Sequence, residues 1–184
     1  CRAPEYAEAV QPIAGELIAR LTHAHDLVIV DTSSNWGDAV ACAAQMADRL
    51  VIVSDERPGA IPALARCGSL AVRLGVARTR IVRLMNGCDP RKRDESFVAR
   101  AAVGLECARE VRVLDGGLDL VELASAGECG RLSSSDNPAA LDASRGLAGL
   151  LKELGALPEC TEAQAALEGG QRRRRLFGFA REAS

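Results

Sequence analysis

A carboxylate and a hydroxyl stand side by side at the end of a short apolar run in the segment Asp26–Asp38. Leu27 to Val30 predict a strand buried on both faces, and Asp31 and Thr32 follow it directly. In parallel sheets, ligands collect at the carboxyl ends of the strands. A carboxylate there commonly holds Mg²⁺ through water beside a nucleotide phosphate, because Mg²⁺ prefers hard oxygen ligands. A surface aspartate that closes a strand is the alternative, and this segment alone leaves both open.

A second candidate is the amide of Asn86, which ends another strand-like run. An amide both donates and accepts, so it can pair with a purine edge in a way that a serine or an aspartate cannot. Its place at the carboxyl end of a strand aims it at the ligand crevice of a parallel sheet. The alternative is that Asn86-Gly87 is only a turn dipeptide, since both residue types tolerate positive φ.

The cysteines predict neither a zinc site nor a disulfide framework. Their number is odd, no CxxC pair occurs, and consecutive cysteines are at least nineteen residues apart. We interpret most of them as small buried apolar residues of a reducing cytoplasm. A cluster assembled from distant cysteines, or one that bridges two subunits, stays open. The seven are Cys1, Cys42, Cys67, Cys88, Cys107, Cys129 and Cys160.

Composition indicates a folded globular chain without a membrane span. The 184 residues are 48% hydrophobic and 26% charged, which is too apolar for a disordered protein and enough for one domain with a substantial core. No apolar run approaches the length of a membrane-spanning helix, and no secretory signal opens the chain. Because the first residue is Cys1 rather than methionine, we expect a processed or truncated product.

Strand-like runs alternate with helix-like stretches along the chain. This alternation predicts an α/β fold with a mostly parallel sheet, helices on both faces and right-handed crossovers. The predicted strands are Leu27–Val30, Leu50–Val53, Arg80–Met85 and Glu110–Leu114. The predicted helices are 5–23, 38–47, 60–74, 94–103, 118–126 and 138–154.

Four segments between residues 26 and 155 follow one another in a recognisable order: DLVIVDTSSNWGD, ADRLVIVSDERPGAIPALARCGSLAVRLG, RIVRLMNGCDP and GLECAREVRVLDGGLDLVELASAGE. In this order they resemble the C-terminal two-thirds of the ParA/MinD superfamily of P-loop ATPases, nearest the CpaE/TadZ branch of pilus-assembly and polar-localisation proteins. Ser33 and Ser34 stand where the family usually has a proline pair, Gly87 where it often has a basic residue, and Val113 where a proline is usual.

The resemblance implies a nucleotide-binding P-loop ATPase that positions or assembles a surface or pilus machine. Asp31, with Thr32 nearby, would serve Mg²⁺, while Asn86 and the backbone around Asp115 would hold the base of ATP. Catalysis would be phosphoryl transfer to water. The implied partners are a second copy of the chain and pilus or polar-localisation proteins, in the cytoplasm or peripherally at the inner membrane.

The phosphate loop of this family does not occur in the sequence. GxxxxGK[ST] appears nowhere, and such a loop supplies the backbone N–H groups and the lysine that hold the phosphates. We therefore interpret residues 1–155 as a partial ATPase domain, and we predict that this chain alone does not hydrolyse ATP. A non-catalytic interaction module derived from such an ATPase is one alternative. An iron–sulfur-carrying relative of the nitrogenase iron protein, suggested by Cys42 after Asp38, is another.

After a linker at 156–170 the chain ends in a basic, aromatic tail at 171–184. The tail has a net charge of +4, while residues 1–170 carry −6. It resembles the membrane-targeting segment of MinD-like proteins, in which arginines meet anionic headgroups and apolar side chains enter the interface. A solvated tail explains the composition as well as a membrane does, and a nucleic-acid contact is the weaker alternative. The residues are Arg172, Arg173, Arg174, Arg175, Leu176, Phe177 and Phe179.

Overall fold

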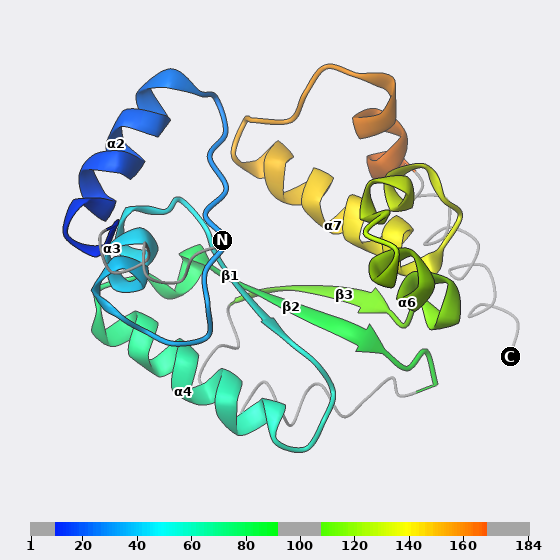
Figure 1. Ribbon diagram of the computed structural model, residues 1–184, viewed down its shortest axis with the longest axis horizontal. Helices are drawn as coiled ribbons and strands as arrows, with labels where there is room; N and C mark the ends of the chain where they lie inside the picture. The colour runs from blue at the N-terminus through cyan, green and yellow to red at the C-terminus, as the bar shows by residue number, and fades with distance from the viewer. Residues whose placement is uncertain (1–9, 92–107, 169–184) are drawn as a thin grey trace, which may run out of the picture. The chain divides into compact units, whose positions relative to one another are not determined.

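The computed structural model describes residues 10–91 and 108–168 of this α/β protein (Figure 1). Three strands, β1 (Leu50–Ser54), β2 (Ile81–Cys88) and β3 (Arg109–Leu114), form a parallel sheet in the order β1-β2-β3. The predicted fold class and three of the four predicted strands are confirmed. Neighbouring parallel strands need a crossover connection, and α4 (Ala60–Arg73) lies in the connection between β1 and β2.

The described helices lie close to their predicted positions. Those predicted at 38–47, 60–74, 118–126 and 138–154 are confirmed to within two residues. Of the stretch predicted at 5–23, residues 11–13 form η1 and residues 14–23 lie in α2, while residues 5–9 lie outside the described residues. The helix predicted at 94–103 also lies outside them. Residues 161–168, within the predicted linker, are also helical. Besides α4, the elements are η1 (Gln11–Ile13), α2 (Ala14–Ala24), α3 (Asp38–Met46), η2 (Arg78–Arg80), α6 (Gly117–Ser125), η3 (Cys129–Ser134) and α7 (Pro138–Glu153).

Local sequence signals determine both ends of α7. The Asn137 side chain accepts a hydrogen bond from the Ala139 N–H at 3.0 Å, and Pro138 occupies the first turn. This arrangement satisfies one of the otherwise unpaired N–H groups of the helix start. At the other end Gly155 has a φ of +68°, the left-handed conformation that commonly terminates a helix.

The strand predicted at Leu27–Val30 is wrong. These residues are not part of the sheet, and Leu27, Ile29 and Val30 are 45%, 83% and 47% exposed. A strand exists only where a neighbour accepts and donates its backbone hydrogen bonds, and within residues 10–91 and 108–168 this segment has no strand partner. Its β-branched composition describes a fit to a pleated sheet rather than an independent preference for extended backbone.

The chain divides into two compact units, each described here by itself. The first unit comprises Cys1–Ile52, Gly59–Arg83 and Ser96–Arg109. The second unit comprises Val53–Pro58, Leu84–Glu95 and Glu110–Ser184.

Apolar side chains from helices and strands form the core of the first unit. Ala71 and Ile81 are fully buried in it, and Trp36 and Leu50 pack against its edge. The start of β2 is also tied to α3, because the Arg80 guanidinium donates to the carbonyls of Gln45, at 3.0 Å, and Ala47. The core residues are Ala44, Ile52, Leu64, Ala71, Val76, Ile81 and Ala108.

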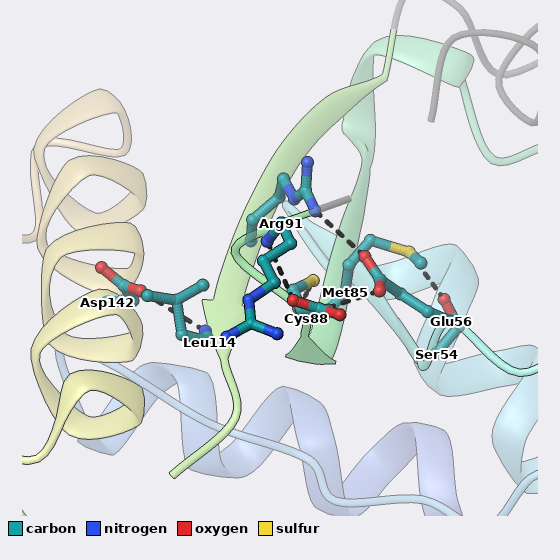
Figure 2. A network of polar contacts seen from close by, with 9 residues as sticks. Ser54, Glu56, Met85, Cys88, Arg91, Leu114 and Asp142 are labelled. Atoms are coloured by element: carbon teal, nitrogen blue, oxygen red, sulfur yellow. Dashed lines mark hydrogen bonds and ion pairs between the residues drawn. The ribbon is translucent and has the colours of Figure 1, made fainter. Parts of the chain in front are cut away.

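In the second unit α7 packs closely on β3. A Cβ added at Gly146 of α7 would lie 2.2 Å from Cγ1 of Val111, so only glycine allows this approach. Asp142 on the same helix accepts a hydrogen bond from the Leu114 N–H at 3.4 Å (Figure 2). It also pairs with Arg145 at 2.9 Å. Farther along the unit, η3 contacts both α6 and α7. No helix within the described ranges is long and apolar enough to cross a bilayer.

Candidate functional site

The structure brings two of the predicted site residues, Asn86 and Asp115, to one edge of the sheet. Asn86 lies near the carboxyl end of β2, and Asp115 directly follows β3; both are exposed. The Asp115 N–H donates to the Cys88 carbonyl at 3.2 Å, so the ends of the two strands are joined. Parallel α/β sheets bind their ligands at this edge. The pair therefore lies where a ligand site is expected.

The backbone that follows Asp115 forms a tightly held turn. The Asp115 carboxylate accepts a hydrogen bond from the Gly117 N–H at 2.9 Å, and the Gly116 carbonyl accepts one from the Asn137 side-chain amide at 2.9 Å. A Cβ at Gly116 would lie 2.7 Å from Cβ of Leu120, so glycine is required for the close approach of α6. Two hydrogen bonds thus hold this turn in place after β3.

Backbone conformation separates the roles of Asn86 and Gly87. Gly87 has a φ of +68°, which explains the glycine after Asn86. In the part of the chain that the structure describes, only glycines have positive φ, so Asn86 does not. Both residues lie within β2 rather than in a turn, so the positive φ accounts for Gly87 but gives no backbone reason for an asparagine at position 86.

Glu56, which the sequence did not single out, positions this edge of the sheet. Its carboxylate accepts from Arg112 of β3 at 3.0 Å and from the N–H of Asp89 at 3.2 Å (Figure 2). The Glu56 and Arg112 side chains are only 23% and 31% exposed, so water screens their attraction less than at an open surface. Glu56 thereby connects the loop after β1 to the residue after β2 and to β3. Asp89 and Arg112 are 33 and 56 positions from Glu56 in the sequence, so no local sequence pattern predicts these contacts.

Cys88 lies under the same edge and has the character of a buried structural thiol. It is fully buried, and its Sγ donates to the Met85 carbonyl at 3.3 Å. Burial raises the pKa of the Cys88 thiol, and the neighbouring Arg112 guanidinium offsets this only in part. Because the thiolate is the reactive form, a raised pKa makes Cys88 inert at neutral pH.

We expect iodoacetamide at neutral pH to modify Cys160 at least about 100-fold faster than Cys88 in the folded chain. Cys160 is exposed, whereas Cys88 can react only after an opening of the structure. Site-resolved mass spectrometry along a time course measures both rates, and denaturation in guanidinium should bring them together. Similar rates in the folded chain would contradict the burial of Cys88.

The other described cysteines show no arrangement that binds a metal. Cys42, Cys67, Cys88 and Cys160 are free thiols, and the described residues include no group of three His, Cys, Asp or Glu side chains suited to a metal ion. Cys42, the residue that suggested an iron–sulfur cluster, has its Sγ 3.7 Å from the Met46 Sδ. A Cβ at Gly15 would lie 3.1 Å from that Sγ, so Cys42 fills space between α2 and α3.

Asp31 and Thr32 belong to the first unit, in the exposed loop before α3. Ser33 and Asn35 shape this loop, because the Ser33 hydroxyl accepts a hydrogen bond from the Asn35 N–H at 3.3 Å. A single carboxylate can serve Mg²⁺ when water and phosphate oxygens complete the coordination. The predicted tail residues 172–177 and 179 lie outside the described residues.

No model of a known protein family matches this chain, and the comparisons with curated proteins and with solved structures found no match either.

Proposed function

We propose that this chain is part of a MinD/ParA-like nucleotide-binding ATPase that acts in the positioning or assembly of a surface or pilus machine. The observation that carries the proposal is the position of Asn86, exposed near the carboxyl end of β2, at the sheet edge that also holds the hydrogen-bonded turn after Asp115. An amide at such a place suits the edge of a purine base, which presents both donors and acceptors.

The roles follow from the chemistry of each group. Asn86 would pair with the base, and the turn at Asp115–Gly117 would lie against it. Asp31, with Thr32, would serve the Mg²⁺ that accompanies ATP. The sequence contains no phosphate-binding loop with its lysine, so this chain by itself would hold the base but would not stabilise the charge that develops during phosphoryl transfer. A second copy of the chain and pilus or polar-localisation proteins are the proposed partners.

Calorimetric titration of the full chain with ADP, ATP and GTP in the presence of Mg²⁺ tests the proposal. Asn86→Ala should weaken the binding of the preferred purine nucleotide by about 1–3 kcal/mol, the usual cost of leaving a polar partner unsatisfied. The melting temperature of the unliganded variant should stay nearly unchanged, because Asn86 is exposed. Gln164→Ala is the matched control, since it removes an exposed amide from the helical stretch 161–168 of the same unit.

Two results would count against this function. A wild-type chain that binds no purine nucleotide at millimolar concentration would leave the interaction-module alternative in its place. An Asn86→Ala variant that melts much earlier but binds nucleotide with unchanged affinity would show that Asn86 has a structural role, and the assignment of the base site would be wrong.

A further inference from the structure

Helix α6 has an apolar face that no described residue covers. None of its residues is buried, and Leu118 and Val121 are 78% and 58% exposed. Residues three and four apart share a helix face, so Leu118, Val121 and Glu122 lie together. Leu120 points to the other side, where it packs on Gly116. Leu118 and Val121 therefore form one contiguous apolar strip on the surface of α6.

The charge around this face selects a basic occupant. Between Asp115 and Glu128 the chain carries four carboxylates and no lysine or arginine. Glu128 pairs with Arg131 at 2.6 Å, whereas Asp119 and Glu122 form no ion pair with any other residue that the structure describes. The face therefore combines exposed leucine and valine side chains with two carboxylates that pair with no other described residue.

The C-terminal tail has the complementary chemistry. Four arginines at 172–175 directly precede Leu176, Phe177 and Phe179, so basic and large apolar groups are adjacent. The last described residue is Glu168. It belongs to the second unit, and α6 belongs to the same unit. Residues 169–184 follow in the sequence, and fully extended they would span roughly 50 Å.

We propose that α6 is the docking surface for the chain's own C-terminal tail. The arginines would meet Asp119 and Glu122, and the aromatic rings would cover Leu118 and Val121. Tethering favours this occupant, because an attached segment acts at an effective concentration of about millimolar. The proposal goes beyond nucleotide binding and does not depend on it. The same arginines and rings would contact an anionic membrane, so docking on α6 and membrane binding exclude each other.

Limited trypsin digestion of the full chain tests the docking, because Arg172–Arg175 are the cleavage sites. Cleavage there depends on the fraction of chains with a released tail when opening and closing are fast. Leu118→Ser combined with Val121→Ser should accelerate loss of the tail by about tenfold. Leu147→Ser is the control, because Leu147 is 49% exposed on α7 and lies outside the proposed surface. Asp119→Asn with Glu122→Gln should also accelerate cleavage and leaves the apolar residues unchanged.

Circular dichroism melts of each variant verify that the fold is retained. Cleavage rates that neither double variant changes would overturn the proposal. Protection that falls on dilution of the wild-type chain would assign the tail to a second copy and overturn docking within one chain.

Co-sedimentation with phosphatidylserine vesicles is a separate experiment on membrane binding by the tail. If the tail also binds membrane, a larger fraction of the Leu118→Ser, Val121→Ser variant than of the wild type should sediment with the vesicles. If the tail arginines are protected from trypsin but neither the wild type nor the variant binds the vesicles, docking on α6 is supported and the membrane role of the tail is wrong.

Discussion

Gly146→Ala is expected to destabilise the protein by about 1–3 kcal/mol, the usual cost of overpacking a core. In an open helix the same change stabilises by roughly 0.5–1 kcal/mol, so the expected sign is reversed here. The new Cβ would lie 2.2 Å from Cγ1 of Val111 and 3.3 Å from its Cβ and Cγ2. Val111 is 8% exposed on β3 and, being β-branched, has few alternative rotamers. It therefore cannot move aside without shifting the strand or the helix.

Chemical denaturation followed by circular dichroism measures the change in the free energy of unfolding. Gly130→Ala is the control, because a Cβ at Gly130 meets nothing within 4 Å. Val111→Ala with Gly146→Ala should restore part of the loss, since the added methyl group needs space that Cγ1 of Val111 occupies, and the effects of the two substitutions should therefore not add. A Gly146→Ala protein more stable than the wild type would show that α7 and β3 are not packed so closely.

Glu56→Ala should cost about 1–3 kcal/mol of stability, because it removes the carboxylate that serves both Arg112 and the N–H of Asp89. Glu56→Gln should cost less, since its amide oxygen can still accept one of the two hydrogen bonds. If this carboxylate positions the end of β2, both variants should also weaken nucleotide binding at Asn86 without any contact to the ligand. Denaturation and the nucleotide titration described above measure the two effects.

The exposed ion pair of Glu16 and Arg20 provides the matched control for the contacts of Glu56. Its side chains are 63% and 78% exposed, and an open surface pair of this type contributes about 0.3–0.5 kcal/mol. Glu16→Ala should therefore change stability little and nucleotide affinity not at all. Equal losses from Glu56→Ala and Glu16→Ala would show that Glu56 is an ordinary surface carboxylate.

The edge of the sheet that carries Asn86 and Asp115 could be predicted, because β2 and β3 contain several branched apolar residues and polar residues stand at their carboxyl ends. Parallel topology places these ends at one edge, whereas only the structure shows that β2 and β3 are neighbours joined by the Asp115 N–H and the Cys88 carbonyl. Glu56 could not be found in this way, since an acidic residue after a strand is common and only its distant partners distinguish it. The exposure of Leu118 and Val121 could not be predicted from the sequence either, because helical periodicity shows which residues share a face but not what covers that face.

Short-range chemistry in the sequence by itself determined most of the element types and both ends of α7. The asparagine cap, proline and glycine that bound α7 act within a few residues of one another, so they have the same effect in any surroundings. Tertiary structure decided the rest. Leu27–Val30 has the composition of a strand but lies exposed outside the sheet, because a strand requires hydrogen-bond partners from another segment. Gly146 marks the contact of α7 with β3, and only the packed structure shows it, since that contact joins residues 35 positions apart.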